Sequence, residues 1–385
     1  MRGLLRSGEE ARVTNIELFF DLIYVFAFTQ VSEHLYEHVT WTGSLETLVM
    51  LLALWWAWNG TAWATGLVDP ERTRTAALLL GLMGISLVAA TSVTEAFKER
   101  GLTFAASYVA IQLVRGGFMV AVFEAGSEMR RNYLQLLACS AITAPLWIAG
   151  GVVHGDDLRL ALWFVAIAVD LSIPAVGYLL PGHRAVRIGD WVLAGGHLAE
   201  RCQLLLMVGF GETFLRIGEA FAVGRRKEQA VIAFLVGFVL ICSLWTIYFL
   251  RHAARSTETM EAELGKPGRL GRSGFTYPLA VLLAAVIVVA DAIHIAIDAP
   301  TASASFGFSM LCIGGTALYL GGIAFSRYWL EHPDATRPLV GLPALIVLGG
   351  AAAQINRVTT LVAVTLVSLA MSALLHWGTA PDLAR

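Results

Sequence analysis

Long apolar stretches recur from one end of this sequence to the other, and they limit what the chain can fold into. A helix needs roughly 20 mostly apolar residues to cross a bilayer, and that length applied along the chain predicts about twelve membrane spans. They lie at about residues 15–37, 44–66, 74–96, 101–123, 132–153, 158–180, 192–222, 229–250, 275–297, 303–325, 338–355 and 358–378. The sequence therefore predicts an all-α, polytopic transmembrane helix bundle.

The composition supports a membrane location. Of the 385 residues, 57% are hydrophobic and 15% are charged, whereas a soluble domain has about 25% charged residues. So few charges leave too little polar surface to cover a water-soluble body. The net charge of −2 gives no indication of a nucleic-acid partner, and we expect the lipid bilayer to be the main partner.

The distribution of lysine and arginine predicts the orientation of the chain. If the N-terminus is cytoplasmic, segments on that side hold 17 of the 27 Lys and Arg residues and segments on the other side hold 7. The other three, Arg115, Arg201 and Arg216, lie inside predicted helices. Because positive charges collect in cytoplasmic loops, we expect both termini to be cytoplasmic.

Short motifs recur in the same order in the two parts of the chain, which indicates an internal repeat. The matches are Glu17 with Glu200, Leu54-Trp55 with Leu244-Trp245, and Gly116-Gly117 with Gly321-Gly322. We therefore predict a 6+6 parallel repeat within one integral membrane domain. Residues 1–190 would form the first six-helix half and residues 191–385 the second.

Two carboxylates lie at the start of the first predicted span, NIELFFDLIYVFAFTQ. Glu17 and Asp21 are four residues apart, so they share one face of a helix. An ionised side chain in hydrocarbon costs about 2.5–3.5 kcal/mol, so that face must look into the bundle or toward water. The pair could form a proton or cation site, or a catalytic acid pair. Alternatively, the two acids could stabilise the positive helix N-terminus and pair with a neighbouring arginine.

The seventh predicted span, GGHLAERCQLLLMVGFGETFLRIGEAF, contains several ionisable residues. At 100° per residue, Arg201, Glu212 and Glu219 fall within about 20° of each other. His197 and Arg216 flank this stripe, and Glu200 lies to one side. Glu212 lies deep in the span, where a carboxyl group that switches between neutral and ionised forms would suit a proton-coupled site. An Arg216–Glu212 pair that merely neutralises both charges is the alternative. We expect Glu17 or Asp21 to approach the Arg201–Glu212 stripe.

Arg115 is a single cation at the middle of the fourth predicted span. A buried arginine requires a counter-ion, and we expect Asp21, Asp170 or Glu212 to supply it; the sequence does not choose among them.

A further polar face occurs in the ninth predicted span, where Asp291, His294 and Asp298 follow one another at i, i+3 and i+7. Side chains of these types can bind a metal ion, but three ligands on one helix rarely complete a site, and we expect no metal there. The chain contains no GxxxxGK[ST], no HExxH and no GxSxG in its required context. We therefore expect no cofactor.

The segments ELFFDLIYVFAFTQ (Glu17 to Gln30) and HLAERCQLLLMVGFGETFLRIGEAF (from His197) resemble the bacterial low temperature requirement A family. Its members typically open with Glu-Leu-Phe-Phe-Asp-Leu and carry a His-x-x-Glu-Arg helix that ends in Gly-Glu. By this resemblance, the family-type positions are Glu17, Phe19, Phe20, Asp21, His197, Glu200, Arg201, Gly211 and Glu212. The resemblance implies a multi-pass protein of the bacterial cytoplasmic membrane but no mechanism.

These observations favour a transporter of a small solute or ion that is coupled to a cation or to protons. Glu17, Asp21 and Glu212 would bind or relay, with Arg115 and Arg201 as electrostatic partners. An enzyme embedded in the membrane is the first alternative, with Glu212 or Asp21 acting as a general acid on a lipid or isoprenoid. A non-transporting scaffold that supports growth in the cold is the second.

Overall fold

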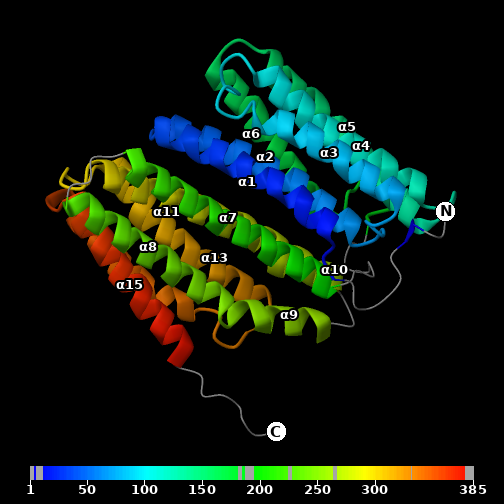
Figure 1. Ribbon diagram of the computed structural model, residues 1–385. Helices are drawn as coiled ribbons and strands as arrows, with labels where there is room; N and C mark the ends of the chain where they lie inside the picture. The colour runs from blue at the N-terminus through cyan, green and yellow to red at the C-terminus, as the bar shows by residue number, and fades with distance from the viewer. Residues whose placement is uncertain are drawn as a thin grey trace, which may run out of the picture. The chain divides into compact units, whose positions relative to one another are not determined.

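The computed structural model describes residues 4–5, 12–180, 184–186, 195–223, 228–262, 267–330 and 332–377. These residues are helical apart from turns, short connections and two isolated β-bridges, so the predicted all-α fold is confirmed (Figure 1). Three sequence predictions fall outside the described residues: the boundary between the two halves at 190/191 and the locations of the two termini.

The chain forms two compact units. The first unit contains residues 1–201 together with 263–269, and the second contains residues 202–262 and 270–385. Helices α7 (Gly195–Val223) and α10 (Pro267–Leu270) each contribute residues to both units.

The first unit consists of long helices joined by short turns, with α3 and α5 packed on either side of α4 (Figure 1). Its helices are α1 (Asn15–Glu37), α2 (Trp41–Thr65), α3 (Thr73–Ala90), α4 (Gly101–Val122), α5 (Glu128–Val152) and α6 (Asp156–Ser172), followed by the first turns of α7.

The second unit contains long helices and several short helical turns. Its α-helices beyond α7 are α8 (Glu228–Phe249), α9 (His252–Ala262), α11 (Tyr277–Asp298), α12 (Phe306–Ser309), α13 (Gly315–Trp329), α14 (Leu342–Ala351) and α15 (Arg357–Trp377). Two π-helical turns, Gly271–Thr276 and Met310–Gly314, lead into α11 and α13. Helices α8 and α15 pack together, as do α11 and α13.

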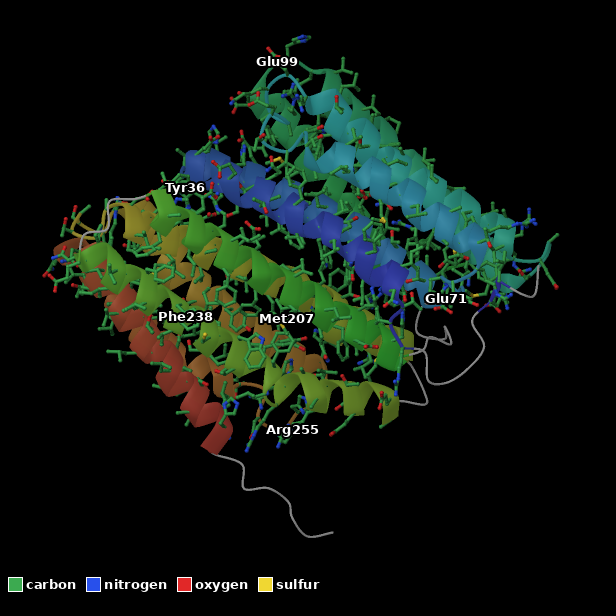
Figure 2. All side chains as sticks on the ribbon, viewed as in Figure 1. Tyr36, Glu71, Glu99, Met207, Phe238 and Arg255 are labelled. Atoms are coloured by element: carbon green, nitrogen blue, oxygen red, sulfur yellow. The ribbon has the colours of Figure 1, made fainter. Side chains whose placement is uncertain are left out.

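Nine helical segments in the described residues are long and apolar enough to cross a membrane. They are α3, α4, α5, α6 with its 3-10 turn, α8 with α9, α11 with its preceding turns, α12 with α13, α14 with its flanking 3-10 turns, and α15. Large apolar side chains cover much of the outside, including Phe238 on α8 (46% exposed) and Val347 on α14 (74% exposed) (Figure 2). Such a surface suits lipid rather than water, so this is a multi-pass membrane protein.

Each of the twelve predicted spans overlaps a helix or a continuous helical run in the described part of the chain, although some boundaries differ and residues 192–194 of the seventh lie outside that part. The third predicted span ends at Ala90 instead of residue 96, because the hydroxyl groups of Thr91 and Ser92 both donate to the Val88 carbonyl and compete with the helical hydrogen bonds. The sixth ends at Ser172 and continues as a 3-10 turn, which stops at Gly177 in the left-handed conformation (φ 68°).

Arg159 stabilises one end of the first unit through hydrogen bonds to backbone carbonyls. Its side chain is 5% exposed, and its guanidinium group donates hydrogen bonds of 2.9–3.1 Å to the backbone carbonyls of Ala96, Lys98, Gly150 and Val153. Carbonyls without a helical partner in the α3–α4 connection and at the C-terminal end of α5 are thus satisfied by a single side chain on α6.

Candidate functional site

Helix α1 presents its two N-terminal carboxylates to the interior of the first unit. Glu17 is 0% exposed and Asp21 is 2% exposed, whereas Phe19 and Leu22 on the opposite face are more than half exposed. The periodicity of the sequence explains this arrangement, because Glu17 and Asp21 lie one helical turn apart on the same face. The two acids therefore point away from the lipid-compatible face of α1.

The two oxygens of Glu17 have different partners. Oε2 accepts hydrogen bonds from the backbone N–H of Thr14 (3.0 Å) and from the Thr14 hydroxyl (2.9 Å), which caps the start of α1. Oε1 lies 3.0 Å from Nε2 of His197 and 3.0 Å from Nη1 of Arg201, both on the first turns of α7. Glu17 thus caps its own helix and connects it to α7.

Asp21 completes a four-residue cluster of Glu17, Asp21, His197 and Arg201, which we call the acid–Arg cluster. Asp21 Oδ1 accepts a hydrogen bond of 2.7 Å from Arg201 Nη2 and another of 2.7 Å from the indole N–H of Trp58 on α2. The Arg201 guanidinium also lies over the Trp58 ring, 5.7 Å from its centroid. Arg201 therefore bridges both carboxylates of α1, and the predicted approach of α1 to Arg201 is present.

One additional proton would balance the charges of the acid–Arg cluster. Two carboxylates and one guanidinium sum to one negative charge when His197 is neutral. Four of its buried atoms have no hydrogen-bond partner among the described residues, and two of these four, Asp21 Oδ2 and His197 Nδ1, are of a type that can accept a proton. A proton at either atom would bring the cluster to neutrality, which is strongly favoured where the dielectric constant is low. The geometry is therefore suited to binding a proton or a small cation.

Glu200 lies beside this cluster, as the sequence predicts, but has a different contact. Its Oε2 accepts a hydrogen bond of 3.2 Å from the backbone N–H of Val13, and the side chain is only part-buried. Glu200 thus binds the backbone of the segment that precedes α1.

The counter-ion predicted for Arg115 is not found in its own unit. Its guanidinium donates to the side-chain oxygen of Gln112 and, at 2.9 Å, to the backbone carbonyl of Ala57. It forms no direct ion pair with Asp21 or Asp170 in the described part of the unit, and the third candidate, Glu212, belongs to the second unit. Gly60 on α2 explains the difference, because it has no side chain and lets the guanidinium group reach the α2 backbone.

Asp170 is connected to Arg115 indirectly, through two neutral side chains. Gln112 Nε2 donates to the Tyr108 hydroxyl at 2.9 Å, and that hydroxyl donates to Asp170 Oδ2 at 2.8 Å. The Trp147 indole N–H donates to the same oxygen at 3.1 Å. In this series of hydrogen bonds, each donor lies on the side of the arginine and each acceptor on the side of the carboxylate. The two charges therefore stabilise each other at a distance.

The second unit contains the remaining predicted acids. Glu212 is 1% exposed and Arg216 is 2% exposed. Arg216 lies 3.7 Å from buried Asp291 and 3.6 Å from Glu219, whose side chain is 62% exposed. The predicted stripe is therefore not uniformly buried: Glu219, one turn from the end of α7, reaches the surface, as a long charged side chain near a helix end can.

Asp291, His294 and Asp298 do not come together as a ligand set. Asp291 lies near Arg216, and His294 Nε2 lies 3.6 Å from Asp298. Across the described ranges, no group of three or more His, Cys, Asp and Glu side chains is arranged to hold a metal ion.

The sequence analysis did not identify Trp58 or the Tyr108–Trp147 pair. The signal that could have found them is chemical: a buried indole N–H or phenol O–H requires a hydrogen-bond partner, and carboxylates lie inside the same helical unit.

Comparison with known proteins is consistent with these features. The family model described as bacterial low temperature requirement A protein (LtrA) matches residues 12–373. A protein of Rhizobium meliloti (strain 1021), described as uncharacterized, is 31% identical over 320 residues, which cover 83% of this chain and 78% of the relative. No solved structure matches the chain.

Proposed function

The chain belongs to the bacterial low temperature requirement A family, and from this premise we propose that it is a proton-coupled transporter of a small solute or ion. The proposal places it in the bacterial cytoplasmic membrane, with the acid–Arg cluster as the proton-binding site. One observation carries the proposal: two buried carboxylates share one arginine, and one of them also contacts a histidine, so the cluster is electrically neutral only with an additional proton when that histidine is neutral.

The same observation favours transport over an enzyme that acts on a lipid. Buried chains of Asp, Glu and His are the usual proton relays of pumps and transporters. An acid that protonates a lipid substrate would need an approach for that substrate, whereas here both carboxylates are held by Arg201, His197, Trp58 and Thr14. A structural role is the second candidate, because each carboxylate does have a cationic partner.

We also propose that the transporter has twelve spans in two six-helix halves, with residues 1–190 and 191–385 as the halves and both termini cytoplasmic. The twelve helical segments, the recurring motifs and the distribution of positive charge support this organisation. Glu212, Arg216 and Arg115 remain candidates for the binding of the transported solute, since each is an ionisable side chain in a predicted span.

Proton movement across proteoliposomes tests the transport function. The protein is reconstituted with a trapped pH-sensitive dye, and Na⁺, K⁺, or mixtures of amino acids or sugars are added outside in separate arms. With wild-type protein, at least one of the added solutes should change the internal pH. Asp21→Asn should reduce the change to the level of protein-free liposomes, because it removes the negative charge that the extra proton balances.

Glu37→Gln is the matched control, because it is the same loss of a carboxylate on the same helix but at an exposed position. Its flux should stay within about twofold of wild type, as expected for a surface substitution. If no arm moves protons with wild-type protein, or if Asp21→Asn matches Glu37→Gln, the structural role becomes the better account.

A further inference from the structure

A second group of cationic side chains lies in the second unit, and none of its members belongs to the acid–Arg cluster. It forms where α9, the end of α13 and the segment after α13 meet. The backbone N–H of His332 donates to the Arg327 carbonyl at 3.0 Å, which folds the chain back on the last turn of α13. The His332 ring then lies 6.2 Å from the ring of His252 at the start of α9. We call Arg255, Arg327, His332 and Arg337 the basic cluster.

Arg327 is the central residue of this cluster. It is 9% exposed, and its Nε atom is buried without a hydrogen-bond partner in the described residues. Its guanidinium group forms no ion pair with a described carboxylate. The buried Nε2 atom of His332 has no hydrogen-bond partner there either. Burying an arginine in this state is unfavourable, since the desolvation of its charge is not compensated.

The neighbouring charges increase this imbalance. Arg255 and Arg337 lie near enough to repel the Arg327 charge. Asp334 is the carboxylate that attracts it, but Asp334 also pairs with Arg337 at 3.5 Å. Among the described residues, these three guanidinium groups and one carboxylate sum to two positive charges. Burial, followed by the charges of Arg327 and Arg255, lowers the pKa of His332, so its imidazole is a neutral hydrogen-bonding group at pH 7.

The position of the cluster along α13 suits contact with the membrane surface. Tyr328 and Trp329 adjoin Arg327, and Tyr328 is 68% exposed. Tyrosine and tryptophan concentrate at the level of the lipid headgroups. Arg255, by contrast, is exposed and extends from α9 (Figure 2). One arginine at headgroup level and another reaching out from a neighbouring helix could contact a phosphate group together.

We propose that the basic cluster binds a phosphate-bearing anion, either the headgroup of an anionic phospholipid or free phosphate. The guanidinium groups of Arg327 and Arg255 would contact the phosphate oxygens, and the uncompensated charge of Arg327 would be neutralised. This site is independent of the proposed transport function, because none of its residues belongs to the acid–Arg cluster.

Binding is measured by native mass spectrometry of the full chain released from nanodiscs. One arm uses phosphatidylcholine with phosphatidylglycerol, and the other uses phosphatidylcholine alone with inorganic phosphate replacing chloride at constant ionic strength. A retained anion is expected in one of the arms, which identifies its source. Arg255→Gln should weaken this binding by about fivefold, the effect expected of one arginine at a membrane surface, and Arg327→Gln should weaken it further.

Arg74→Gln is the matched control, since Arg74 is an exposed arginine on α3. It should leave the binding unchanged. Arg255 is also exposed, so Arg255→Gln decides the result even if Arg327→Gln does not fold. The proposal is overturned if neither anion is retained, or if Arg255→Gln binds it as well as Arg74→Gln does.

Discussion

Replacement of Arg201 by glutamine is expected to produce the largest loss of stability of any single substitution in the acid–Arg cluster. It leaves Glu17 and Asp21 buried without the guanidinium group that both of them contact. Breaking a buried ion pair by removing one partner costs about 3–5 kcal/mol. We expect the labelling of Cys202, the adjacent and 1% exposed residue, by a thiol-reactive dye to accelerate by roughly a hundredfold or more.

Two comparisons separate the charge effect from a general loss of packing. Arg201→Gln combined with Asp21→Asn should recover much of the lost stability, because the double variant contains one fewer buried charge. Arg72→Gln removes an arginine from an exposed pair with Asp69 (3.1 Å) and should change the stability by less than about 1 kcal/mol. The account of the cluster is wrong if the double variant is as unstable as both single losses added together.

Replacement of Arg159 by glutamine is the second large prediction. It removes charge-assisted hydrogen bonds to four backbone carbonyls, and glutamine is too short to restore them. Hydrogen bonds to charged groups contribute about 1.5–3 kcal/mol each, so we expect the free energy of unfolding to fall by at least about 3 kcal/mol. Dye labelling of buried Cys139 on α5, followed by peptide mass spectrometry, measures this loss within the same unit.

Arg100→Gln is the control for Arg159→Gln. Arg100 also donates to a backbone carbonyl, that of Thr91 at 3.0 Å, but it is exposed and water can replace it. Its loss should change the labelling of Cys139 by no more than a few-fold. Equal effects of the two substitutions would show that the hydrogen bonds from Arg159 to the backbone carbonyls do not stabilise the first unit.

The sequence predicts the helical framework well because apolar length is a strong signal. The first predicted span, 15–37, coincides with α1, and the four-residue spacing of Glu17 and Asp21 places both acids on the buried face. The partner of Asp21 was predictable as well: an arginine inside a membrane helix must meet a carboxylate, and Arg201 does so.

Other contacts depend on geometry that a sequence does not contain. The carboxylate predicted beside Arg115 is replaced by a carbonyl of α2, because Gly60 allows close approach. Asp170 meets the same arginine only through Gln112 and Tyr108. Residue types alone do not show whether Arg115 and Asp170 form a direct ion pair or are connected through neutral side chains. Either arrangement stabilises the charge of Arg115.

The central claim is that the acid–Arg cluster holds one exchangeable proton, and an infrared pH titration of the protein in nanodiscs tests it most directly. Wild-type protein should show one proton leaving a buried carboxyl or imidazole group as the pH rises. Asp21→Asn and Glu17→Gln should each abolish this signal, because either change makes the cluster neutral without the extra proton, and Glu37→Gln should retain it. A wild type with no such titration, or a signal that persists in both cluster variants, would contradict the account.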